Sequence, residues 1–172
     1  MPAEYPALIA MGVDELFEKL DVLRGKKTVI VCMGNILKGD DGAGPLVFQQ
    51  LKGKVRADLI DAGTVPENYI QMIIKKSPQN LIIIDAVDFA APAGTINIFR
   101  PEQLANLVVS THTLSPRLFI DCVCRSIKVD VYFIGIQPAQ TQFNAPVSSE
   151  VQKAVQRLVN ILTAIFFQES KT

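Results

Sequence analysis

The chain has 172 residues, of which 49% are hydrophobic, enough for one domain with its own core and incompatible with a generally disordered chain. The 17 Lys and Arg balance the 17 Asp and Glu, so no overall charge attracts nucleic acid or an anionic membrane surface. Three cysteines make no disulfide framework, and the apolar runs fall far short of the ~20 residues of a membrane span. We therefore expect a cytoplasmic protein that neither binds nucleic acid nor inserts into a membrane.

The spacing of apolar residues alternates between helical and strand periods along the chain. Expected helices and strands, in chain order, are a helix over 13–23, a strand over 28–33, a helix over 45–52, a strand over 55–61, a helix from Thr64 to Lys76, strands over 81–84 and 95–99, a helix opening at Ser115, a strand over 129–136 and a helix opening at Ser148. Thr64 and Glu67 have the spacing of a capping box.

This alternation predicts a single α/β domain over residues 27–168, preceded by an appended helical segment over 1–26. We expect an open, mainly parallel twisted sheet of about five strands with helices on both faces. A monomer is the simplest oligomeric state for such a chain.

Acidic residues follow the first three expected strands. They are Asp40 and Asp41 in a Gly-rich loop over 34–44, Asp61 after the second strand, and Asp85 after an aliphatic run. The only histidine, His112, precedes a helix start in a polar loop. Because ligands of open α/β sheets bind beyond the carboxyl ends of the strands, we expect these groups to gather on one rim.

The Gly-rich loop does not have the pattern of a nucleotide-binding loop. It lacks both G-x-G-x-x-G and G-K-[ST], and its two carboxylates would repel a phosphate. Two carboxylates and an imidazole are instead a suitable ligand set for a divalent metal with one open position. Two alternatives remain open. Any single aspartate could cap a helix or turn, and His112 could have a structural role.

Cys122 and Cys124 fall in the expected helix that opens at Ser115. Their side chains point about 200° apart around a helix, so they cannot share a metal. We expect both to pack in the core.

The chain resembles the nickel–iron hydrogenase maturation endopeptidases, in particular the branch that serves formate-hydrogenlyase-type and related membrane-bound hydrogenases. The resemblance covers about residues 28–167. The motifs that carry it, in the family's order, are GNILKGDDGAGP at 34–45, DAGTVPEN at 61–68, LIIIDA at 81–86, PAGTI at 92–96, STH at 110–112 and GIQP at 135–138.

The resemblance implies an enzyme that removes a C-terminal extension from the precursor of a hydrogenase large subunit after nickel insertion. It places the family's nickel-contacting positions on Asp41, Asp85 and His112, and a further catalytic aspartate on Asp61. The nickel would be supplied by the precursor. The residues expected to contact the substrate are Gly34, Asn35, Asp40 and Gly63.

Two departures concern the geometry of the loops. Residues 32–35 read Cys-Met-Gly-Asn where many relatives have a second glycine, and residues 61–63 read Asp-Ala-Gly where relatives often have two glycines.

Two other functions stay open: a hydrolase with its own permanently bound divalent metal, and a non-enzymatic metallochaperone or nucleotide-binding module.

Overall fold

The computed structural model describes residues 10–107 and 115–167, in which five strands form one sheet in the order β2-β1-β3-β5-β4. Neighbouring strands are parallel except for β4, which runs antiparallel to β5 at one edge. The strands are β1 (Thr28–Met33), β2 (Asp58–Gly63), β3 (Asn80–Ala86), β4 (Ile96–Phe99) and β5 (Asp130–Ile136). The expected mainly parallel sheet of about five strands is therefore confirmed.

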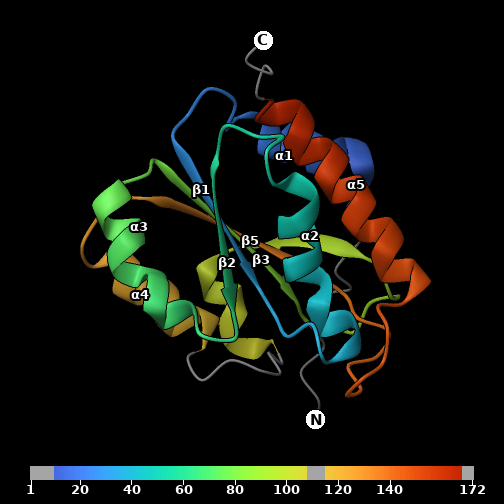
Figure 1. The fold of residues 1–172 in the computed structure, drawn as a ribbon. Coiled ribbons are helices and arrows are strands. Elements are labelled where there is room, and N and C mark those ends of the chain that lie inside the picture. Colours follow the sequence, from blue (N-terminus) through green and yellow to red (C-terminus); the bar gives the residue numbers. More distant parts are fainter. Residues whose placement is uncertain (1–9, 108–114, 168–172) are drawn as a thin grey trace.

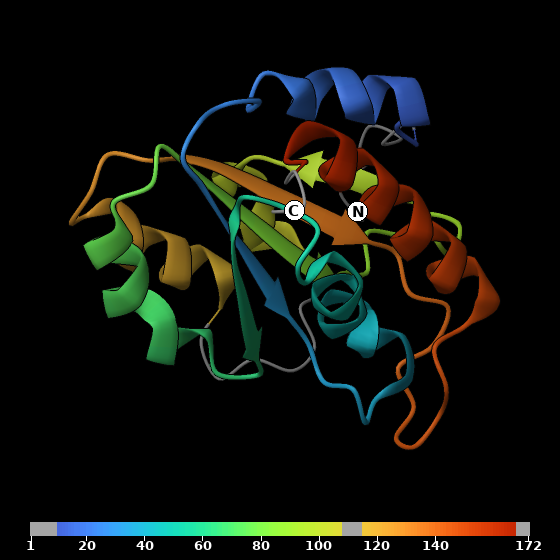
Figure 2. The ribbon, with the colours of Figure 1, turned by 45° about the horizontal axis from the view of Figure 1, so that its top comes forward.

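Helices cover both faces of the sheet (Figure 1). Helices α2 and α5 lie together on one face with α1 packed outside α5, and α3 and α4 lie together on the other (Figures 1 and 2). The helices are α1 (Val13–Asp21), α2 (Ala43–Leu51), α3 (Ile70–Lys76), α4 (Pro116–Cys124) and α5 (Ser149–Ile165), with short 3₁₀ helices η1 (Gly39–Gly42), η2 (Pro66–Tyr69) and η3 (Pro101–Asn106). None of the described helices is long and apolar enough to cross a membrane.

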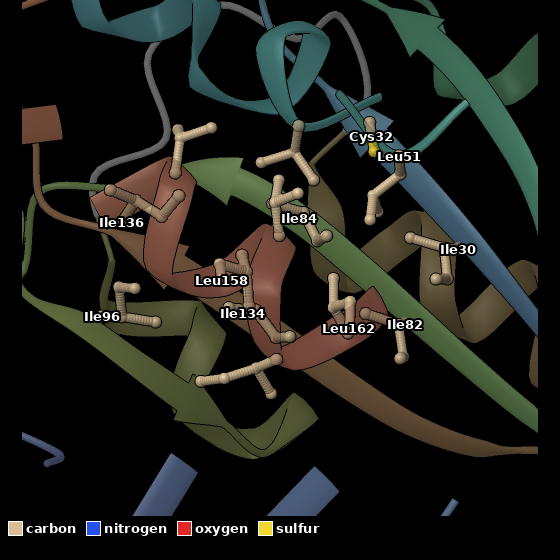
Figure 3. Close-up of a cluster of buried hydrophobic side chains, with 14 of the residues drawn as sticks. Ile30, Cys32, Leu51, Ile82, Ile84, Ile96, Ile134, Ile136, Leu158 and Leu162 are labelled. Atoms are coloured by element: carbon tan, nitrogen blue, oxygen red, sulfur yellow. The ribbon is translucent and has the colours of Figure 1, made fainter. Parts of the chain in front are cut away.

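The sheet divides the core into two layers because successive strand residues point to opposite faces. On the face covered by α2 and α5, Ile30, Ile82 and Ile134 pack against Leu158 and Leu162 (Figure 3). The opposite layer, under α3 and α4, is formed by Val29, Val31, Leu81, Ile83, Phe119 and Phe133 among others. Strands β1 and β3 are buried along their whole length, as a central strand covered on both faces should be.

The first helix belongs to the same core. Leu16, Leu20 and Leu23 are buried and lie in the cluster formed by α2, α5 and the sheet. The helix expected over 13–23 is thus present, and its apolar face packs against α5.

Two of the three helix starts predicted from capping residues are confirmed, and one is wrong. The side chains of Ser115 and Ser148 accept hydrogen bonds from Leu118 and Val151 N–H and cap α4 and α5, as expected. The capping box at Thr64 and Glu67 was wrong. Pro66 opens the 3₁₀ helix η2 there, and α3 begins only at Ile70 without a side-chain cap.

The two helical cysteines do not both pack in the core. Both lie on α4 as expected, but Cys122 is only half-buried and Cys124 is exposed. The inward face of α4 is formed by Phe119, Ile120 and Val123, which leaves position 124 facing solvent.

Candidate active site

The strand order predicts a crevice at the switch point between β1 and β3. From β1 the chain passes through α2 to β2 on one side, whereas β3 and β5 lie on the other side. The connections that leave the carboxyl ends of β1 and β3 therefore diverge, and open α/β sheets bind ligands at such a switch point. Asp41 follows β1 and Asp85 lies near the end of β3, so both belong to this crevice.

Asp85 is a fully buried carboxylate at the exit of an apolar strand. It lies beside Gly135 of β5, and the residues two positions before and after it, Ile83 and Val87, face the α3–α4 layer. By the alternation of the strand, Asp85 points toward that layer too. A carboxylate in this position must be solvated, paired or bound to a ligand.

Asp41 is held in the 3₁₀ turn η1 and is also buried. The Asn35 N–H donates both to Asp41 Oδ2, at 3.0 Å, and to its carbonyl oxygen, at 3.1 Å. The Asp41 N–H donates to the Lys38 carbonyl at 3.0 Å. The turn lies against the end of β3, which brings Asp41 to the same part of the rim as Asp85.

Two glycines allow this loop to pack directly on the sheet. A Cβ on Gly34, whose φ is +139°, would lie 1.9 Å from the Asp41 carbonyl oxygen. A Cβ on Gly44 would lie 2.0 Å from the Met33 carbonyl oxygen, so the start of α2 is pressed against the end of β1. The Gly34 N–H also donates to the Gly63 carbonyl at 2.9 Å, which joins the loops after β1 and β2.

Asp40 is oriented away from the crevice, into a network of protein donors. Its Oδ2 accepts from Ala139 N at 2.8 Å, Gln140 N at 3.2 Å and Ser148 Oγ at 2.8 Å. Its Oδ1 accepts from Ser148 N at 2.6 Å. These contacts link η1 to the loop between β5 and α5.

Asp61 lies on a different face of the sheet from Asp85. It pairs with Cys32 of β1, and Cys32 belongs to the α2–α5 layer. Asp61 is exposed at the edge strand, where its Oδ1 accepts from Gly63 N at 3.4 Å. Burial raises the pKa of the Cys32 thiol far above its usual range, and the negative charge of Asp61 raises it further.

His112 lies outside the described residues. Among the parts of the chain that the structure describes, no three His, Cys, Asp or Glu side chains come together as a metal site. Asp41 and Asp85 nonetheless provide buried carboxylate oxygens on one rim, and carboxylates with an imidazole suit a borderline divalent ion. The described residues include two of the three expected positions, and their assignment as metal ligands stays a prediction.

The sequence motifs gave no role to Gln137, which organises the other side of the crevice. Gln137 is buried just after β5. Its Oε1 accepts from Phe89 N at 2.8 Å and Ala91 N at 3.2 Å, and its Nε2 donates to Asp88 Oδ1 at 3.1 Å. A polar residue directly after an aliphatic strand was the available signal. Its hydrogen-bond partners lie almost fifty residues away in the chain, so the sequence could not predict which residues they are.

Comparison with known proteins identifies the family. The model of the HycI hydrogenase maturation protease family matches residues 45–165. The chain belongs to the hydrogenase maturation protease family. It is 35% identical over 131 residues to the hydrogenase 3 maturation protease of Escherichia coli K12, which covers 74% of this chain and 83% of that one. A putative hydrogenase maturation protease of Methanocaldococcus jannaschii is 32% identical over 85% of this chain and 92% of its own.

Solved structures of maturation proteases have the same fold. The endopeptidase HycI of Escherichia coli superimposes with a TM-score of 0.74 at 34% identity, over 80% of this chain and 90% of that one. The HycI protease of Thermococcus kodakarensis gives 0.77 at 30% identity, over 86% and 97%. This hydrogenase maturation protease is therefore a peptidase, and the non-enzymatic binding module is set aside.

Proposed function

We propose that this protease removes a C-terminal extension from the nickel-loaded precursor of a hydrogenase large subunit in the cytoplasm. One observation carries the proposal: Asp41 and Asp85, both buried, lie on one rim at the switch point between β1 and β3. In a maturation protease, such a rim is suited to bind a metal ion that the substrate brings. His112 would complete the ligand set, as the family resemblance implies.

Burial of the two carboxylates would let the protease distinguish a nickel-loaded precursor from a nickel-free one. Two like charges in a poorly solvated crevice repel each other, and a divalent cation offsets that repulsion. A precursor without nickel would not offset that repulsion and would gain little on docking. Specificity then comes from the difference in binding free energy between the nickel-loaded and the nickel-free precursor.

The chemistry is hydrolysis of one peptide bond by water. Water adds to the scissile carbonyl carbon, the C–N bond breaks, and the released amine takes a proton. The nickel of the substrate, held by Asp41, Asp85 and His112, can polarise the carbonyl or activate the water. No serine or cysteine nucleophile motif is present, which favours direct attack by water.

The surface around the rim suits a protein substrate. Ile36, Leu37 and Phe143 expose 67%, 51% and 68% of their surfaces. Ile36 and Leu37 belong to the loop that carries Asp41, and the Asn144 N–H, next to Phe143, donates to the Leu37 carbonyl at 2.8 Å. The two loops lie side by side at the carboxyl edge (Figure 2), so these apolar side chains belong to the same edge of the sheet as Asp41.

A cleavage assay tests the proposal. The purified protease is mixed with nickel-loaded and nickel-free hydrogenase large-subunit precursor, and the products are weighed by mass spectrometry. We expect release of a C-terminal peptide from the loaded form alone. Release from both forms would support C-terminal cleavage but show that it does not depend on nickel. No release from any precursor tried would overturn the proposal. A metal ion that copurifies at one per chain would favour a resident metal instead.

A further inference from the structure

Asp40 connects three segments that lie far apart in the sequence. Its carboxylate accepts hydrogen bonds from residues 139 and 140, in the loop after β5, and from both the N–H and the hydroxyl of Ser148. Its own N–H donates to the Gln140 carbonyl at 3.0 Å. The turn η1 is thus joined to the loop after β5 by both backbone and side chain.

The carboxylate is bound mainly by donors of the protein itself. Its Oδ2 accepts from three protein donors and its Oδ1 from one, whereas an ionised carboxyl group offers about four lone-pair sites. Asp40 is also fully buried. Contact with the precursor would require these hydrogen bonds to break, at the cost of leaving buried donors unpaired.

Ser148 links the network to the buried helix α5. It is the N-cap of α5, where the helix dipole favours a negative charge such as that of Asp40. Its Oγ donates to Asp40 and accepts from Val151 N at 3.4 Å. Helix α5 has 17 residues, eight of them buried, so the network ties η1 to the core.

The position of Asp41 depends on this network. Asp41 follows Asp40 in the same four-residue turn. The turn also packs on the side chain of the neighbouring loop, since a Cβ on Gly39 would lie 2.4 Å from Gln140 Oε1. Loss of the Asp40 contacts would free the turn to rotate, and a misplacement near 1 Å can cost about 100-fold in rate.

We propose that Asp40 and Ser148 are positioning residues, which hold Asp41 in the orientation needed for cleavage without contacting the precursor. The proposal rests on the proposed function, in which Asp41 binds the nickel of the substrate. It replaces the expectation that Asp40 binds substrate directly.

The experiment compares four variants by steady-state cleavage of the nickel-loaded precursor. Asp40→Asn replaces one acceptor oxygen by a donor, and Ser148→Ala removes the hydroxyl. Ser148→Thr retains it. Ser149→Ala is the matched control, because the neighbouring Ser149 is exposed and its hydroxyl bonds only to Glu150 at 3.2 Å among the described residues.

We expect Asp40→Asn and Ser148→Ala to lower kcat at least tenfold, and any rise in KM to accompany that fall, because a displaced Asp41 also binds the nickel of the precursor less well. Ser148→Thr and Ser149→Ala should keep both constants within twofold. A rise in KM at unchanged kcat would overturn the proposal, because loss of uniform substrate binding has that signature. Unchanged kcat in both loss-of-contact variants would overturn it as well.

A second readout needs no substrate. The Asn35 amide, which donates to Asp41, should exchange its hydrogen faster in Asp40→Asn and Ser148→Ala than in wild type, while amides of β3 keep their protection. Unchanged Asn35 protection would contradict the proposal. Should Asp40→Asn fail to fold, Ser148→Ala carries the test. Should wild type fail to cleave, the proposed function fails, and the exchange data still decide whether this network holds Asp41.

Discussion

Asp85 and Gly135 lie side by side across the parallel pair β3–β5. A Cβ at Gly135 would approach Phe99 Cε2 to 2.8 Å and Val87 Cγ2 to 3.0 Å, so the glycine lets these two side chains pack directly on β5, beside the strand that carries Asp85. The carboxylate therefore emerges from an apolar, closely packed environment. A negative charge buried in such surroundings is costly, which favours binding of a cation during the reaction.

Neutralising this carboxylate should abolish processing and leave the fold intact. Asp85→Asn keeps the shape of the side chain and removes the charge that would bind the metal, as does Asp41→Asn. We expect the cleavage rate to fall by roughly 100-fold or more in each, and likewise in His112→Ala. Gel-based cleavage of the nickel-loaded precursor measures the effect, with circular dichroism as the test of folding.

Asp130→Asn is the matched control. Asp130 is an exposed aspartate at the opposite, amino end of β5. This substitution should leave cleavage within twofold of wild type. Normal cleavage by all three site variants would refute the site assignment.

Close packing between α2 and β1 gives a stability prediction. In Gly44→Ala, the new methyl group would lie 2.0 Å from the Met33 carbonyl oxygen and 2.8 Å from its nitrogen, both backbone atoms that cannot move aside cheaply. We expect a loss of about 2–3 kcal/mol in the free energy of unfolding, with cleavage falling as the Asp41 turn shifts. Urea unfolding measures the loss.

Gly12→Ala serves as the comparison, because nothing lies within 4 Å of the position that its new methyl group would take, and its φ is −66°. It should change the free energy of unfolding by less than about 0.5 kcal/mol. Equal effects of the two substitutions would be evidence against the close approach at Gly44.

The buried thiol predicts how stability depends on pH. Because the pKa of Cys32 is raised in the folded state, the unfolded chain releases its thiol proton first as the pH rises. Above roughly pH 8.5, the contribution of Cys32 to the free energy of unfolding should therefore fall by about 1.4 kcal/mol per pH unit. This contribution is fully present at neutral pH.

Cys32→Ala isolates that contribution. Urea unfolding at several pH values between 7 and 10 should give a shallower decline for the variant than for wild type. Parallel curves would mean that Cys32 does not titrate differently in the two states. The exposed Cys124 gives a second check, since it should react with iodoacetamide in the folded protein while Cys32 stays protected.

The apolar surface beside the crevice predicts a binding defect. Phe143→Ala should raise KM for the precursor several-fold with little change in kcat, because the ring is 68% exposed and contributes little to the core. Val22→Ala is the control, since Val22 is 56% exposed just after α1. Equal KM values for both variants would place the precursor elsewhere. Thermal melts should be unchanged in both.

The sequence allowed the sheet to be predicted because the aliphatic runs are local signals. The run 81–84 identified a strand buried on both faces, and Asp85 at its exit marked the rim. Two features depend on contacts between distant residues and could not be read. The pairing of Asp61 with Cys32 puts Asp61 on the opposite face from Asp85, and the donors around Asp40 come from about a hundred residues further along the chain.

The N-terminal helix has a consequence for how the protein can be divided. Leu16, Leu20 and Leu23 fill the same core layer as α5. Full burial of one leucine is worth about 1.5–3 kcal/mol, so three of them rival the 5–15 kcal/mol by which a whole domain is typically stable. A shortened chain that begins at Lys27 would expose the apolar surface of α5 that these leucines cover. We expect it to self-associate or unfold. We therefore expect the smallest unit that folds alone to include α1.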